Sequence, residues 1–196
     1  MPASSIVWVS AFLVYFGFLL WYLPCGRRLS ADERAALLAR IRAGEHDVEQ
    51  AATIERFLAE DRGGSFVMVN LLALAEPRAE ARRALRAYER RFVGRLLRLA
   101  GHPLFIGRGA SVRNIEQWGI EASGWDAVAL VRYRCRRDLA RMIDFSLDGD
   151  TRALKHRALA RTIAFPVSPW MVSGGPCLVV GLALALLAVL LQRVLA

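Results

Sequence analysis

Hydrophobic residues form two long runs at the ends of the chain and a patterned series between them. No charged side chain occurs before Arg27, and none occurs between Arg161 and Arg193. The apolar core of each run approaches the roughly 20 residues that a helix needs to span about 30 Å of hydrocarbon. A core helix of a soluble protein usually keeps a polar face, and these runs lack one. We therefore expect two transmembrane helices, over residues 4–24 and 171–192.

The sequence around the first run indicates a retained anchor. No basic residue precedes the run, whereas a signal peptide usually begins with basic residues. The motif YLPCG around Cys25 resembles a lipoprotein cleavage site only loosely, because Leu23 and Pro24 fit such a site poorly. Aromatic residues stand near the expected helix ends, as they do at membrane interfaces: Trp8, Trp21, Tyr22 and Trp170.

Arginines beside the two runs predict the orientation. Five follow the first run: Arg27, Arg28, Arg34, Arg40 and Arg42. Only Arg193 follows the second. Because basic residues favour the cytoplasmic side, we expect residues 26–168 in the cytoplasm and both termini outside, in a multi-pass protein of the bacterial inner membrane. The cysteines show no paired spacing, which fits a reducing compartment: Cys25, Cys135 and Cys177.

The middle of the chain opens with a predicted pair of helices, over residues 30–61. SADE, beginning at Ser30, is a capping-box pattern, and Gly44 would end the helix that it starts. A second helix, about residues 48–61, places three apolar residues on one side: Ile54, Phe57 and Leu58.

The remainder of the middle predicts four strands, over about residues 65–74, 103–112, 125–135 and 162–167. Helices are predicted between them, over about residues 78–100, 137–145 and 151–161. The order is β-α-β-β-α-β, the ferredoxin-like split βαβ pattern of an antiparallel sheet with helices on one face. We therefore expect an α+β fold, with a ferredoxin-like domain over residues 62–169 inserted between the two membrane helices.

The long helix over residues 78–100 is amphipathic. Its predicted buried stripe is Ala81, Leu85, Tyr88, Phe92, Leu96 and Leu99. Its opposite side carries Arg83, Arg86 and Arg90. These three arginines are candidates for contact with anionic lipid headgroups, which attract basic surfaces tethered beside them.

A ferredoxin-like sheet leaves one face without helices, and this sheet is too apolar to expose both faces. Its strands carry Phe66, Met68, Val131 and Tyr133. We expect a second copy of the domain to cover the remaining face, giving a homodimer.

The composition adds a strong basic balance. Lys and Arg number 27 against 18 Asp and Glu, for a net charge of +9, and Lys155 is the single lysine. One interpretation of the excess of arginine is a high-GC coding bias together with the positive-inside topology. The more specific interpretation is contact of the basic surface with anionic lipid headgroups. No nucleic-acid recognition motif accompanies the charge, so we expect no nucleic-acid partner.

Four segments resemble a domain-of-unknown-function family in the dimeric α/β-barrel (ferredoxin-like) superfamily. They are IERFLAEDRGGSFVMVNLLAL from Ile54, RAYERRF from Arg86, WDAVALVRY from Trp125 and KHRALARTIAFPVSP from Lys155. The resemblance covers about residues 50–169 and implies two ferredoxin-like domains packed sheet to sheet. The predicted membrane helices and the first helix of the pair lie outside it.

The same superfamily contains small monooxygenases and haem-degrading enzymes. Some haem degraders use an asparagine on the first strand, a tryptophan and a histidine on the late helix, which Asn70, Trp125 and His156 match in type and order. A cavity beside the sheet would be mainly apolar, as ligand sites usually are. Its candidate residues are Phe66, Met68, Asn70, Trp125, Tyr133 and His156.

Residue by residue, other interpretations stay open. Asn70 could instead bond backbone, Tyr133 could be packed, and His156 could lie on a helix surface. Asp144, Asp148 and Asp150 are typical of turns and caps around DGD. No Cys/His spacing fits a metal, and no nucleophile with a base or phosphate loop is recognisable, so we expect no cofactor.

Two functions follow as hypotheses. The first is a membrane-anchored cytoplasmic module that dimerises or binds a small ligand or partner. The second is an enzyme that uses the barrel cavity, such as an oxygenase or isomerase acting on a small apolar molecule.

Overall fold

The computed structural model describes residues 3–24, 26, 28–43, 48–111, 114–116, 118–119, 124–169 and 174–195. Four residues used in the sequence analysis lie outside these ranges: Cys25, Arg27, Gly44 and Trp170. The chain divides into two compact units, one formed by Met1–Cys25 with Pro169–Ala196 and the other by Gly26–Ser168.

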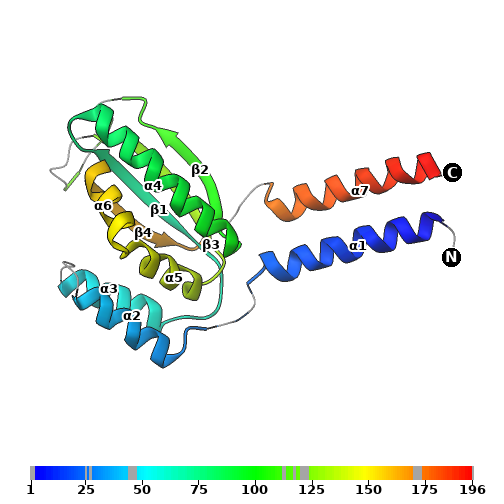
Figure 1. Cartoon of the computed structure of the whole chain (residues 1–196), viewed down its shortest axis with the longest axis horizontal. Helices are drawn as coiled ribbons and strands as arrows, with labels where there is room; N and C mark the ends of the chain where they lie inside the picture. Colours follow the sequence, from blue (N-terminus) through cyan, green and yellow to red (C-terminus); the bar gives the residue numbers. More distant parts are fainter. Residues whose placement is uncertain are drawn as a thin grey trace. The chain divides into compact units, whose positions relative to one another are not determined.

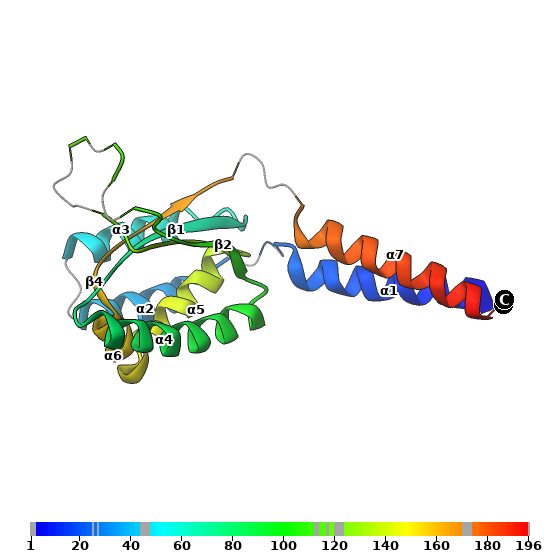
Figure 2. The same ribbon diagram turned by 90° about the horizontal axis from the view of Figure 1, so that it is seen from above.

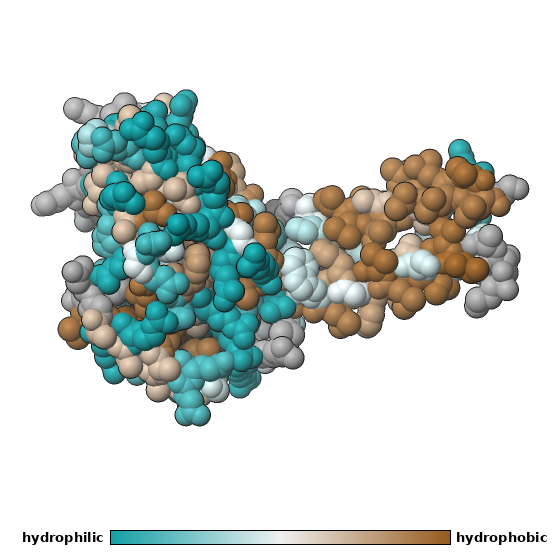
Figure 3. Space-filling model, in the orientation of Figure 1, coloured by the Kyte–Doolittle hydropathy of each residue, from teal (hydrophilic) through white to brown (hydrophobic). Residues whose placement is uncertain are grey.

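The first unit is a pair of apolar helices, α1 (Ala3–Tyr22) and α7 (Pro176–Leu195), which lie side by side (Figure 1). Hydrogen bonds join them: Trp8 Nε1 donates to Gln192 Oε1 over 3.0 Å, and the Tyr15 hydroxyl donates to the Cys177 carbonyl over 3.1 Å. Both helices are long and apolar enough to cross a membrane. Their surface is mainly hydrophobic, as Figure 3 shows.

The second apolar helix is displaced from its predicted bounds. We expected it over residues 171–192, but α7 begins at Pro176 and ends at Leu195. Proline favours the first helical position because its missing N–H needs no partner there. Gly174, just before it, has a φ of 66°.

In the second unit, α2 (Ala31–Ala43) and α3 (Val48–Ala59) form the predicted helical pair. The predicted capping box is confirmed: Ser30 N–H donates to Glu33 Oε2 over 3.0 Å, and Glu33 N–H donates to Ser30 Oγ over 3.1 Å. The pair shares a buried cluster with Ala140 of the following domain. It is therefore part of the same compact unit as the sheet.

The predicted α+β architecture is confirmed. The strands are β1 (Phe66–Leu74), β2 (His102–Arg108), β3 (Ala127–Tyr133) and β4 (Leu159–Val167). The helices among them are α4 (Arg78–Arg98), α5 (Arg136–Ser146) and α6 (Gly149–Ala158). The strands form one antiparallel sheet in the order β2-β3-β1-β4.

The helices α4, α5 and α6 lie on one face of this sheet (Figure 2). The core between the layers consists of Phe66, Leu96, Leu99, Val131, Tyr133, Leu139 and Met142. In α4, Ala81 and Leu96 are buried, as the amphipathic pattern predicts.

The bounds of β2, β3 and β4 differ from the predicted ones. β4 begins at Leu159 rather than residue 162, because Leu159 pairs with Leu74 as soon as α6 ends. β3 begins at Ala127, and the amide of Asp126 just before it donates to the Leu72 carbonyl over 2.8 Å. β2 ends at Arg108, short of residue 112.

Candidate functional site: the open face of the sheet

Alternation along β1 assigns its side chains to two faces. Phe66 and Met68 pack in the core beneath the helices, so Val67, Val69 and Leu71 point to the opposite face. No helix of the described domain covers that opposite face (Figure 2), which we call the open face.

Two apolar rows cross the centre of the open face. The first runs Phe165, Val69, Leu130 and Phe105 in register from β4 to β2. The second runs Ile163, Leu71, Val128 and Gly107. Neighbours on one face of a sheet are close enough for their side chains to touch. The rows therefore form one continuous hydrophobic surface over all four strands.

This surface is exposed in the single chain. Phe105 is 53% exposed, Ile163 44% and Phe165 43%. On the two central strands, Val69 and Leu130 are only half-buried. Contiguous apolar surface of this kind is uncommon in monomers and marks an interaction site or a ligand surface.

Gly107 leaves room for the ring of Phe105. A Cβ atom at Gly107 would stand 2.7 Å from Cε1 and Cζ of that ring. Any side chain at this position would displace the Phe105 ring.

Arginines stand at the two ends of the open face. Arg132 is buried in the row that includes Val67, and its Nη1 donates to the Ala100 carbonyl over 2.9 Å. At the other end, Arg161 Nη2 donates to the Gly124 carbonyl over 2.8 Å, and its guanidinium lies 5.0 Å from the ring centre of Trp125.

The candidate cavity residues on the strands lie in the core. Phe66 and Tyr133 stack with ring centres 5.4 Å apart, and Met68 packs against the same cluster. Burial raises the pKa of Tyr133 far above its usual value, so the phenol stays protonated. These side chains fill the space between sheet and helices, and a ligand cavity among them stays a prediction.

The structure does not gather the polar candidates around that cluster. Asn70 Nδ2 donates to the backbone carbonyls of Met68, over 3.1 Å, and Ala129, over 3.2 Å. Asn70 therefore hydrogen-bonds the backbone, which is the alternative to a ligand contact. Trp125 lies under Arg161, before β3 begins. His156 is exposed on α6. No observation therefore favours the haem-degrading arrangement or the cavity enzyme over the other hypothesis.

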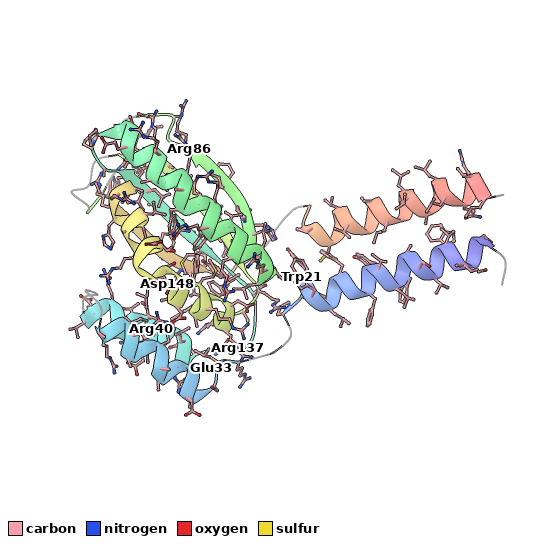
Figure 4. All side chains as sticks on the ribbon, viewed as in Figure 1. Trp21, Glu33, Arg40, Arg86, Arg137 and Asp148 are labelled. Carbon is pink, nitrogen blue, oxygen red and sulfur yellow. The ribbon has the colours of Figure 1, made fainter. Side chains whose placement is uncertain are left out.

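The lipid-facing candidates Arg83, Arg86 and Arg90 are all exposed on α4, and Figure 4 shows Arg86 projecting outward.

In the described part of the chain, no group of three or more His, Cys, Asp or Glu side chains could hold a metal ion.

No family model matches this sequence. No curated protein matches it either. Two solved structures are similar, both of the RPA0582 protein from Rhodopseudomonas palustris, which is described as a protein of unknown function. The first is 25% identical in sequence, and its TM-score is 0.48. The match covers 65% of this chain and 97% of the chain in that structure. The second, of the methylated protein, is 24% identical, covers 67% and 96%, and has the same TM-score.

Sequence reasoning missed the residues that dominate the open face: Phe105, Leu130, Ile163 and Phe165. The signal was present as alternation, because each lies two residues from another apolar or glycine position on the same strand. Which alternate set faces the helices depends on the packing, and the alternation alone does not decide it.

Proposed function

We propose that this protein is a membrane-anchored module whose α+β domain forms a homodimer through its open sheet face. The observation that carries the proposal is the pair of apolar rows, which leaves Phe105, Ile163 and Phe165 in water in a single chain. The finer fold that we propose is ferredoxin-like, of the dimeric α/β-barrel type. The strand order β2-β3-β1-β4, with helices on one face, supports it.

A second copy is the occupant that the surface favours. A two-fold dimer needs a self-complementary patch, and two apolar sheet faces without charges at their centres satisfy this requirement. Sheets that pack face to face interdigitate their side chains over about 10 Å. A partner that binds through charged groups or backbone hydrogen bonds would have few polar side chains to contact along the two central rows.

The size of the face explains why anchoring matters. Four strands about 4.8 Å apart, with seven to nine residues each at about 3.3 Å per residue, give a projected face of roughly 500 Å² per copy. Stable interfaces bury about 800 Å² of accessible surface per partner, so a contact of this size lies at the weak end of the range. Anchoring both copies in one membrane raises their effective concentration and offsets that weakness.

The proposed anchors are α1 and α7, with the domain on the cytoplasmic side of a bacterial inner membrane and both termini outside. Their length and composition support spanning. The five arginines between residues 27 and 42, against a single arginine after α7, support the orientation.

The oligomeric state of the full-length protein in detergent tests the proposal. Light scattering should give a dimer for the wild type. Replacing two exposed residues of the open face, Ile163→Arg with Phe165→Arg, should convert it to a monomer because the buried charges would lack partners. Leu97→Arg, on the 47% exposed Leu97 of α4, is the matched control and should stay dimeric. A wild type that is monomeric at all concentrations, or a dimer that survives the double substitution, contradicts the proposal.

A further inference from the structure

A groove on the helix layer is rich in arginine. It lies between the second half of α4 and the turn that joins α5 to α6, and its volume is about 750 Å³. One wall carries Arg90, Arg91, Arg95 and Arg98, and the other carries Asp148 and Asp150.

The two carboxylates of the groove already have basic partners. Asp148 Oδ1 lies 3.7 Å from Arg40 Nη2 of α2, and both residues are marked in Figure 4. Asp150 Oδ2 lies 3.5 Å from Arg91 Nη1. Within the described residues, no carboxylate forms an ion pair with the remaining three groove arginines: Arg90, Arg95 and Arg98. The groove therefore has an excess of positive charge that faces solvent.

Gly94 lines the groove and leaves open space there. Glycine in the interior of a helix is destabilising relative to alanine, so a structural reason is expected for it. Close packing is not that reason, because a Cβ atom at Gly94 would meet no other atom within 4 Å. Its effect is to leave space on α4 between the arginines.

We propose that this groove binds a phosphate-bearing anion, held chiefly by Arg95 and Arg98. The planar guanidinium fork matches phosphate oxygens with paired, charge-assisted hydrogen bonds. The first turn of α6 forms part of the opposite wall, and its helix dipole favours the same sign of ligand. A phospholipid headgroup and a soluble phosphate ester share this chemistry. The groove lies on the helix layer, so it does not depend on dimerisation through the open face.

Titration calorimetry on the full-length protein, in nanodiscs of pure phosphatidylcholine, tests the proposal with two probes, pyrophosphate and dihexanoyl phosphatidic acid. The first variant, Arg95→Glu with Arg98→Glu, should weaken binding at least tenfold. The second, Gly94→Leu, fills the open space without changing charge and should weaken it similarly. The control, Arg56→Glu with Arg62→Glu, makes the same charge change at exposed positions outside the groove and should retain most of the affinity.

Tighter binding of phosphatidic acid than of pyrophosphate supports a lipid headgroup as the source, and the reverse order supports a soluble phosphate ester. The proposal is overturned if neither probe binds the wild type. It is also overturned if Gly94→Leu, verified as folded by its thermal unfolding, binds as the wild type does, or if the control variant loses as much affinity as the groove variant. Light scattering on the same samples reports dimerisation separately, so failure of one proposal is distinguishable from failure of the other.

Discussion

Asp126 joins three elements through one carboxylate at the start of β3. The Leu74 amide at the end of β1 donates to Oδ2 over 2.7 Å, and Arg78 in the first turn of α4 forms an ion pair with Oδ1. Burial acts to raise the pKa of Asp126, but the Leu74 amide and the Arg78 guanidinium outweigh it, and the pKa is lowered. The charged form is therefore the one that stabilises the fold.

Replacing this residue, Asp126→Asn, should reduce the free energy of unfolding by about 1 kcal/mol at neutral pH, because charge-assisted hydrogen bonds become neutral ones. The wild-type advantage is present above the pKa of an unfolded aspartate and is lost as the pH falls through the lowered, folded value. Thermal unfolding of both proteins between pH 3 and pH 7 measures it. A difference that stays constant across this range would contradict the role of the charge.

Single residues also show where sequence reasoning succeeds and fails. The capping box at Ser30 and Glu33 could be predicted because both partners lie within one helical turn. Asn70 could not be assigned, because its partner at Ala129 is 59 residues away. Contacts between residues so far apart in the sequence can be assigned only when the strand pairing is known.

At the scale of elements, the sequence predicted the type and order of the helices and strands, since the apolar periods of 2 and 3.6 residues are clear. It did not predict which face of β1 meets the helices. Both alternate sets of this strand are apolar, so Phe66 and Met68 could not be distinguished from Val69 and Leu71 by pattern. The open face therefore emerged only from the packing.

The α2–α3 pair provides an element-scale prediction. Ile41 of α2 is 0% exposed in the cluster that the pair shares with α5. Ile41→Ala should lower the free energy of unfolding by about 2–4 kcal/mol, because it leaves a cavity between the helices. Thermal unfolding followed by circular dichroism measures this loss. Val48→Ala, at the 84% exposed start of α3, should have almost no effect, and equal losses in the two variants would mean that the pair is not docked as described.

At the scale of the whole molecule, the domain presents two surfaces of opposite character on opposite sides of its sheet. The open face is apolar, whereas α4 on the helix side carries eight arginines against two glutamates. Packing two open faces together would leave both helix layers exposed, with their arginine grooves accessible. The proposed dimer and the proposed phosphate site can therefore exist in the same assembly.

We propose that two open faces meet in a membrane-anchored dimer. Disulfide cross-linking in native membranes tests it, with Cys25 and Cys177 replaced by serine and the buried Cys135 retained. Single cysteines are introduced at four central positions of the open face and at one control position on α4: Val69→Cys, Leu71→Cys, Val128→Cys, Leu130→Cys and Leu97→Cys. At least one of the four should give a cross-linked dimer, because a two-fold axis brings a central residue near its own copy, and Leu97→Cys should give none. Cross-linking from Leu97→Cys alone, or from none of the five, would contradict it.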